Sequence, residues 1–207
     1  MLFIMSMWGY TGVRSGMSIN EFMMSKGFSS QTGYIGEVQK KQFQKRLSRL
    51  SGIRHILEIG FNAGHSAECF FESCKDLELF VSFDINAFPY TKPAAEYLKQ
   101  LHSNRYSFIE GDSLATVPAY AKHFPEQKFD LIYIDGSHQF ENVIGDIMNT
   151  RLLAHKKTIL WMDDYHYCSI FRAIHFCETL GMIQKKKVFA PNDANDPERK
   201  WIEAKFK

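Results

Sequence analysis

Hydrophobic and polar positions alternate in blocks along most of this chain, and the pattern predicts strands separated by helices. Apolar runs of strand length occur at 55–60, 77–85, 106–111, 130–135 and 158–163. Apolar residues at helical spacing separate these runs, near 64–74, 91–103, 113–123 and 139–153. Near-continuous apolar strands that alternate with helices are typical of a parallel sheet covered on both faces, so we expect a doubly wound α/β domain.

Both ends of this pattern are extended by further elements. Residues 36–50 have the spacing of a helix before the first strand. After the last parallel strand we expect a helix at 169–180 and strands at 183–190 and 199–206, because the PNDANDPE segment between these strands is typical of a turn. The prediction is therefore a mostly parallel, seven-stranded sheet with an antiparallel C-terminal edge hairpin.

The beginning of the chain lacks this order. Residues 1–35 are rich in Met, Gly and Ser without clear periodicity, and we interpret them as an irregular N-terminal segment or lid. Residues 36–207 then form the domain. The apolar opening, MLFIMSMW, is far shorter than the ~20 residues that span a bilayer, and it lacks the basic region of a signal peptide.

Composition narrows the kinds of molecule that the protein is expected to bind. Twenty-five Lys and Arg residues against 23 Asp and Glu residues leave a formal net charge of +2, which favours neither a nucleic acid nor a membrane as partner. The four cysteines form no C-x-x-C pair, and we interpret them as reduced thiols of a cytoplasmic protein. A homodimer formed through the N-terminal segment is an open alternative to a monomer.

Glycines follow the first predicted strand, at the sheet edge where such folds bind ligands. Glu58 is followed by Gly60 and Gly64 in the spacing E-x-G-x-x-x-G. Gly60 permits a tight turn, and Gly64 lets a helix N-terminus approach a ligand closely. Asn62 stands where a G-x-G-x-x-G motif has its middle glycine, which disfavours a dinucleotide site. An ordinary strand-to-helix turn is the alternative.

Polar residues also close the second and third predicted strands. Asp84 can accept two hydrogen bonds from a ribose diol. Asp112 and Ser113 are placed to meet an adenine amino group, although Asp112 is also a good N-cap for the next helix.

These motifs, in this order and spacing, resemble the class I S-adenosylmethionine-dependent methyltransferases. The resemblance rests on HILEIGFNAGHSA, SFDI, IEGDS, FDLIYIDGSHQFENVIGDI and TILWMDDY, and it spans about residues 33–182. The DGSH and DD pieces are most similar to metal-dependent small-molecule O-methyltransferases, including those that modify macrolide sugars. The sequence departs from the family pattern at Asn62, in place of a common glycine, and at His155-Lys156-Lys157, where a Pro-Gly-Gly turn is frequent.

The resemblance implies a Rossmann-like methyltransferase fold and S-adenosylmethionine as cofactor. The turn after the first strand would shape the methionine end of the pocket, the acid after the second would hold the ribose, and the pair after the third would lie near the adenine. The cofactor-binding residues implied in this way are Glu58, Gly60, Phe61, Asn62, Gly64, Asp84, Asp112, Ser113 and Asp135.

Three carboxylates close the fourth and fifth predicted strands. The resemblance implies that Asp135, Asp163 and Asp164 bind a divalent cation. If the two strands are neighbours, these side chains emerge together and would repel one another unless a cation neutralised them. An all-oxygen site suits Mg²⁺, Mn²⁺ or Ca²⁺. Helix capping or loop salt bridges are the alternative for Asp163 or Asp164.

A histidine three residues after Asp135 is the candidate base. His138 has an ordinary pKa near working pH and can take a proton from an acceptor hydroxyl, whose own pKa a bound cation would lower. The resemblance implies the same role, because sugar-modifying relatives use a histidine in this D-G-S-H setting. Asp135 and His138 are thus the candidate catalytic residues, with a surface histidine as the alternative for His138.

The predicted function is therefore methyl transfer from S-adenosylmethionine to an oxygen of a small hydroxylated metabolite, assisted by Mg²⁺ or another divalent cation. A metal-dependent hydroxylase related to the cephalosporin-modifying enzymes and a non-catalytic, S-adenosylmethionine-binding regulatory domain are the alternatives. A nucleic-acid methyltransferase is disfavoured because the chain lacks a strong basic balance and an N-P-P-Y-like motif.

Overall fold

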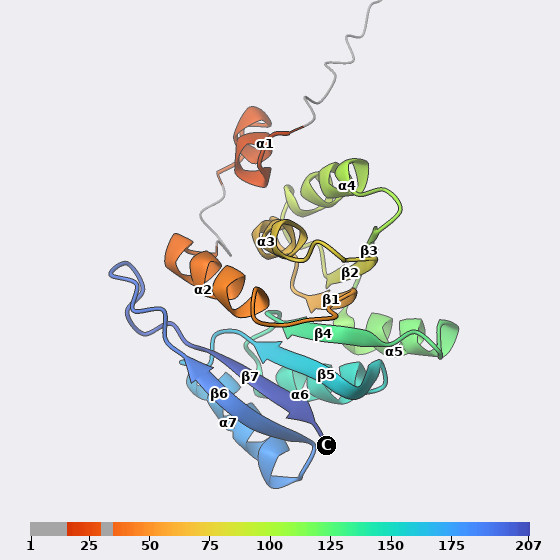
Figure 1. The fold of residues 1–207 in the computed structure, drawn as a ribbon, viewed down its shortest axis with the longest axis vertical. Helices are drawn as coiled ribbons and strands as arrows, with labels where there is room; N and C mark the ends of the chain where they lie inside the picture. The colour runs from red at the N-terminus through yellow and green to blue at the C-terminus, as the bar shows by residue number, and fades with distance from the viewer. Residues whose placement is uncertain (1–15, 30–34) are drawn as a thin grey trace, which may run out of the picture.

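In the computed structural model, which describes residues 16–29 and 35–207, the strands form one sheet in the order β3-β2-β1-β4-β5-β7-β6 (Figure 1). Their bounds are β1 His55–Ile59, β2 Leu79–Asp84, β3 Tyr106–Glu110, β4 Phe129–Ile134, β5 Ala154–Met162, β6 Ile183–Phe189 and β7 Trp201–Phe206. The first five strands pair in parallel, and β7 runs antiparallel between β5 and β6. The predicted doubly wound sheet with an antiparallel C-terminal hairpin is confirmed.

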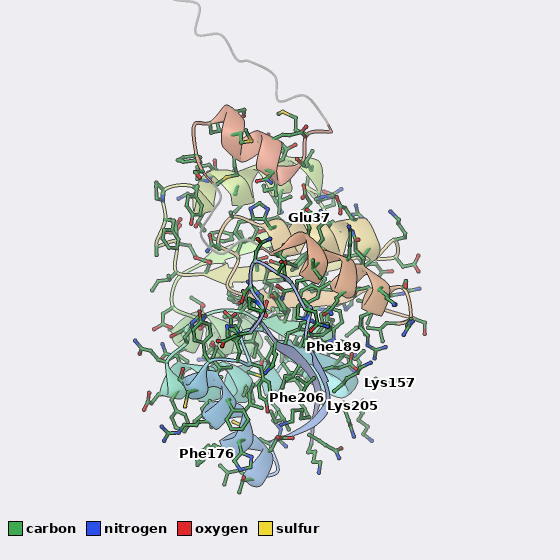
Figure 2. All side chains as sticks on the ribbon, turned by 90° about the vertical axis from the view of Figure 1, so that its left-hand side faces the viewer. Glu37, Lys157, Phe176, Phe189, Lys205 and Phe206 are labelled. Atoms are coloured by element: carbon green, nitrogen blue, oxygen red, sulfur yellow. The ribbon has the colours of Figure 1, made fainter. Side chains whose placement is uncertain are left out.

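Helices cover the sheet on both faces, because alternate strand residues point to opposite sides. In β1, Ile56 enters the core beneath one helical layer, and Leu57 enters the core beneath the other. In the side view, Glu37 at the start of α2 lies above Phe176 of α7, with strands between them (Figure 2). The helices after the first are α2 Glu37–Leu47, α3 His65–Ser73, α4 Thr91–Leu101, α5 Ser113–His123, α6 Phe140–Arg151 and α7 Cys168–Thr179.

The N-terminal segment differs from the prediction. Within the range expected to be irregular, Ile19–Ser25 forms helix α1, which begins with a capping box between Ser18 and Glu21. Met23 is fully buried in the core shared with α3 and α4, and the ring of Phe22 stacks on Tyr97 at 4.2 Å. The rest of the expected segment at 1–15 and 30–34 lies outside the described residues.

The start of β5 is the other difference from the predicted elements. The strand begins at Ala154, four positions before the apolar run at 158–163. Ala154 pairs with Phe129 across an irregularity in the register, and the Thr158 hydroxyl donates to the Phe129 carbonyl oxygen at 2.6 Å. Backbone pairing therefore extends the strand through polar residues that carry no apolar signal.

All four cysteines are free thiols. Across the described ranges, no helix has the length and apolar character needed to cross a membrane.

Candidate functional site

The carboxyl ends of the parallel strands border two adjoining cavities, of about 410 Å³ and about 490 Å³. The first cavity lies at the ends of β2 and β3. The second lies between the residues after β5 and those before β7. Both cavities share one stretch of wall, made of Gly60, Asn62, Phe88, Asp135 and Gly136. This is the edge at which doubly wound sheets bind ligands.

The turn after β1 brings this wall close to β4. Gly60 has a φ of +91°, and a Cβ atom there would lie 1.9 Å from the carbonyl oxygen of Asp135. Asn62 also has a positive φ, of 50°, and its backbone N–H donates to Asp84 Oδ2 at 2.8 Å. Its side-chain Oδ1 atom is buried in the wall and has no hydrogen-bond partner among the described residues. Asn62 Oδ1 is therefore placed to accept a hydrogen bond from a donor group of a bound ligand.

Two predicted cofactor residues lie behind the wall, lining neither cavity. Glu58 is fully buried and accepts hydrogen bonds from Ser66 Oγ at 2.5 Å and Ser82 Oγ at 2.7 Å. Burial raises the pKa of the Glu58 carboxyl to about 7. Gly64 is the N-cap of α3, and a Cβ atom there would lie 2.6 Å from the ring of Phe61, which itself lines the second cavity. The close approach at Gly64 thus serves packing, and direct contact of Glu58 and Gly64 with a cofactor stays a prediction.

The acids after β2 and β3 line the first cavity. Asp84 is oriented by the backbone N–H groups of Asn62 and Asn86, which it accepts at 2.8 Å and 2.7 Å. Asp112 caps α5 through the N–H of Leu114 at 2.9 Å, as its N-cap alternative predicted, and still faces the cavity. Ser113 lines the same cavity and donates to the buried Asp146 at 2.6 Å.

An apolar residue beside Asp84 completes the first cavity. Ile85 is 66% exposed and lines the cavity directly after the strand. A large exposed aliphatic side chain next to a carboxylate suits a ligand with an apolar ring face and a hydroxylated part.

The carboxylates predicted to meet do so. Because Ile134 pairs with Met162 in the β4–β5 register, Asp135 and Asp163 leave their strands at the same level. The Tyr133 hydroxyl lies 3.0 Å from Asp135 Oδ2 and 2.7 Å from Asp163 Oδ2. Burial, together with the charges of Asp163 and Asp164, raises the pKa of Asp135 well above its ordinary value.

His138 joins this cluster from the loop before α6. Its Nε2 lies 2.8 Å from Asp164 Oδ2, and this hydrogen bond raises the pKa of His138. Burial opposes ionisation of Asp164, but the hydrogen bond with His138 and the charge of Arg199 lower the pKa of Asp164 overall. The ring of Tyr167 packs against the imidazole at a centroid distance of 4.6 Å. A half-exposed histidine oriented by a carboxylate is an arrangement suited to proton transfer.

The metal prediction meets a difficulty at Asp163. Its Oδ2 atom accepts from Gln39 Nε2 at 2.6 Å, Tyr133 Oη at 2.7 Å and Arg199 Nη2 at 3.1 Å. A carboxylate oxygen has about two lone-pair sites, so these three donors leave none on Oδ2 for a cation. No group of three or more His, Cys, Asp or Glu side chains in the described parts of the chain is placed to hold a metal ion. The residues, as arranged, do not fit a divalent cation.

Sequence reasoning named none of these three donors, and two of them come from outside the predicted strands that carry the motifs. Gln39 carried a signal, because it occupies the same helical stripe as the buried Phe43 and Leu47, where an unpaired amide would be costly. Arg199 directly follows the PNDANDPE segment, and its spacing from Asp163 gave no indication that the two side chains meet.

Comparison with known proteins identifies the family of this chain. A family model described as a methyltransferase domain matches residues 57–165. A search of curated proteins found no match.

Solved structures show the same fold at low identity. The O-methyltransferase from Bacillus cereus in complex with SAH has a TM-score of 0.68 and 16% identity, covering 91% of this chain and 89% of that one. CalS11, a TDP-rhamnose 3'-O-methyltransferase of calicheamicin biosynthesis, has a TM-score of 0.62 and 21% identity over 81% and 80% of the two chains. The O-methyltransferase TomG from Streptomyces achromogenes, involved in tomaymycin synthesis, has a TM-score of 0.70 and 14% identity over 91% and 87%. Because the family model covers more than half of the residues, the chain belongs to the methyltransferase-domain family.

Proposed function

We propose that this protein transfers the methyl group of S-adenosylmethionine to a hydroxyl oxygen of a small molecule. The observation that carries the proposal is the His138–Asp164 pair, at 2.8 Å, in a cavity that shares a wall with the cavity of Asp84. Methyl transfer to oxygen needs a donor site, an acceptor site beside it and a base at the acceptor. The two cavities and the histidine supply these three parts.

The first cavity suits S-adenosylmethionine. Asp84 would bind the ribose hydroxyls, Asp112 and Ser113 would lie at the adenine with Ile85 against the ring, and the unpartnered Asn62 Oδ1 would accept from a cofactor N–H or O–H group. Bound there, the cofactor would supply an electrophilic methyl group.

The second cavity suits the acceptor. The Nε2 atom of His138 pairs with Asp164, which leaves Nδ1 to accept the proton of an acceptor hydroxyl. Asp164 would stabilise the imidazolium that forms, and Tyr167 would hold the ring in place. Asp135, on the shared wall, would accept a hydrogen bond from the same acceptor.

Further features of the proposal come from the sequence. We propose a small hydroxylated metabolite as acceptor, because a net charge of +2 offers no electrostatic footprint for a nucleic acid. A cytoplasmic location and a possible homodimer stay predictions. The expected Mg²⁺ has no step in this mechanism, since Asp163 Oδ2 already accepts from three protein donors.

Calorimetric titration tests the cofactor first. We expect S-adenosylhomocysteine to bind and NAD, the control ligand, not to bind. Transfer of a labelled methyl group to a panel of hydroxylated acceptors then tests the reaction. His138→Ala should lower that rate by about 10² to 10⁴, the usual contribution of a general base. His123→Ala, at an exposed histidine on α5, should leave it unchanged.

Each failure has its own meaning. No binding of S-adenosylhomocysteine would overturn the proposal and return weight to the hydroxylase alternative. Binding without transfer to any acceptor would favour the regulatory alternative. A His138→Ala rate equal to that of wild type would remove His138 as the base.

A further inference from the structure

The feature that carries a further inference is the set of donors around Asp163. This carboxylate is 2% exposed, so its charge needs compensation inside the protein. Three donors converge on its Oδ2 atom, from Gln39 on α2, Tyr133 on β4 and Arg199 before β7. Its Oδ1 atom accepts the backbone N–H of Asp164 at 2.8 Å. Both oxygens therefore accept from protein donors, and Asp163 is not among the residues that line the second cavity.

Arg199 is the only full cation among these three donors, and the fold anchors it. The backbone N–H of Tyr165, directly after the acid pair, donates to the carbonyl of Lys200 at 2.8 Å. This bond joins the chain beside Arg199 to the chain beside Asp164. The guanidinium then lies 3.1 Å from Asp163 and 3.9 Å from both Asp164 and Asp196. One arginine thus contacts both members of the acid pair predicted to bind a metal.

We propose that Arg199 holds the place of a divalent cation in this cluster, so that the methyltransferase site works without a bound metal. The inference rests on the proposed function for its site. A guanidinium carries one positive charge and several donors in a fixed plane, and it compensates carboxylates without taking lone pairs from an acceptor hydroxyl. Arg199 is a positioning residue in this role: it keeps Asp164 oriented toward His138.

Uptake of Mn²⁺ tests this directly, with the metal alone as probe. The full chain is titrated with Mn²⁺, and free Mn²⁺ is followed by electron paramagnetic resonance. We expect no uptake by the wild type. Arg199→Ala should bind one Mn²⁺ per chain at least about tenfold more tightly than wild type, because removal of the guanidinium leaves the negative charges of Asp163 and Asp164 without their cation. Adding Asp163→Asn to this variant should abolish the uptake again.

A matched control separates this effect from loss of any arginine. Arg54 pairs with Glu78 at 3.0 Å on the surface. It directly precedes β1, whereas the cavities lie at the carboxyl ends of the strands, so Arg54→Ala should gain no Mn²⁺ affinity. If Arg199→Ala does not fold, Arg199→Gln replaces it, since glutamine keeps a donor and much of the volume.

Two results would overturn the inference. One is uptake of one Mn²⁺ per chain by the wild type that Asp163→Asn removes. The other is an Arg199 variant that folds and binds Mn²⁺ no better than Arg54→Ala. Titration of the same preparations with S-adenosylhomocysteine distinguishes failure of this inference from failure of the proposed function. If the wild type does not bind S-adenosylhomocysteine, the proposed function is rejected whatever the Mn²⁺ result.

Discussion

At the scale of single residues, the pair of His138 and Asp164 couples the rate of methyl transfer to pH. The hydrogen bond that His138 donates to Asp164 raises the pKa of His138, so the imidazole stays protonated to a higher pH than an isolated one. A base must be neutral to act, and the rate should therefore rise with pH through this raised pKa. Asp164→Asn should move the acidic limb of the pH–rate profile to lower pH and also lower the maximal rate.

The measurement is kcat/KM against pH for wild type and Asp164→Asn with one accepted substrate. His123→Ala serves as the control whose profile should superimpose on that of wild type. An acidic limb that stays in place in Asp164→Asn would show that this carboxylate does not set the pKa of the base.

Glu58 links stability to pH in the opposite sense. Its folded-state pKa is about 7, raised from 4.5 by burial. The carboxyl of Glu58 therefore loses its proton at lower pH in the unfolded chain than in the folded protein. As a result, the free energy of unfolding falls as the pH rises from 4.5 to 7. Glu58→Gln should remove this loss and make the protein more stable than wild type at neutral pH, by up to about 3 kcal/mol.

Urea unfolding at several pH values checks this, with the exposed Glu126→Gln as control. The quantity to compare is the difference between wild type and variant, because Asp146, whose pKa burial raises to about 6, contributes a similar slope to both. A difference that does not change with pH would contradict the assignment to Glu58.

At the scale of elements, the sequence interpretation and the structure differ most clearly at α1. The S-x-x-E capping box of Ser18 and Glu21 was a usable helix signal, but a helix of this length has too few turns to show periodicity. The parallel strands were predictable because both of their faces are buried, and the longer helices because one face of each is buried over many residues. The start of β5 and the place of Arg199 were not, because both depend on partners distant in the chain.

Two neighbouring methionines test whether α1 belongs to the domain. Met23 is fully buried against the core, whereas Met24 is 73% exposed. Met23→Ala should lower the free energy of unfolding by roughly 2–5 kcal/mol, the usual cost of truncating a buried Met. Met24→Ala should change it by less than about 0.5 kcal/mol. Equal effects in urea unfolding would mean that α1 does not pack as part of the folded core.

At the scale of the whole molecule, the site depends on contacts that join the two ends of the domain. Gln39 and Arg199 lie on opposite sides of the predicted motifs in the chain, yet both bind Asp163. The motifs that were readable from the sequence form the β1–β5 framework, and the segments that flank it supply two of the three side-chain donors to Asp163. Most of the side chains that hold the buried Asp163 therefore come from the parts of the chain with the weakest sequence signal.

A second contact of this kind lies behind the site. Arg46 of α2 donates to both oxygens of Glu203 on β7, at 2.7 Å and 2.6 Å, and Trp161 Nε1 donates to the same carboxylate at 3.1 Å. Glu203 is 9% exposed, so its charge is poorly solvated without the arginine. Arg46→Ala should destabilise the fold by about 2 kcal/mol or more, since it leaves a mostly buried carboxylate without its cation.

A double-mutant cycle with Glu203→Gln measures the coupling itself. If the pair joins α2 to β7 as described, the double variant should be less destabilised than the sum of the single variants, because the unpaired charge is gone. The same cycle on the exposed pair of Arg54 and Glu78 should give a coupling of at most about 1 kcal/mol. Equal coupling in the two cycles would mean that the buried pair contributes no more than a surface one, and that packing alone holds α2 against the C-terminal strand.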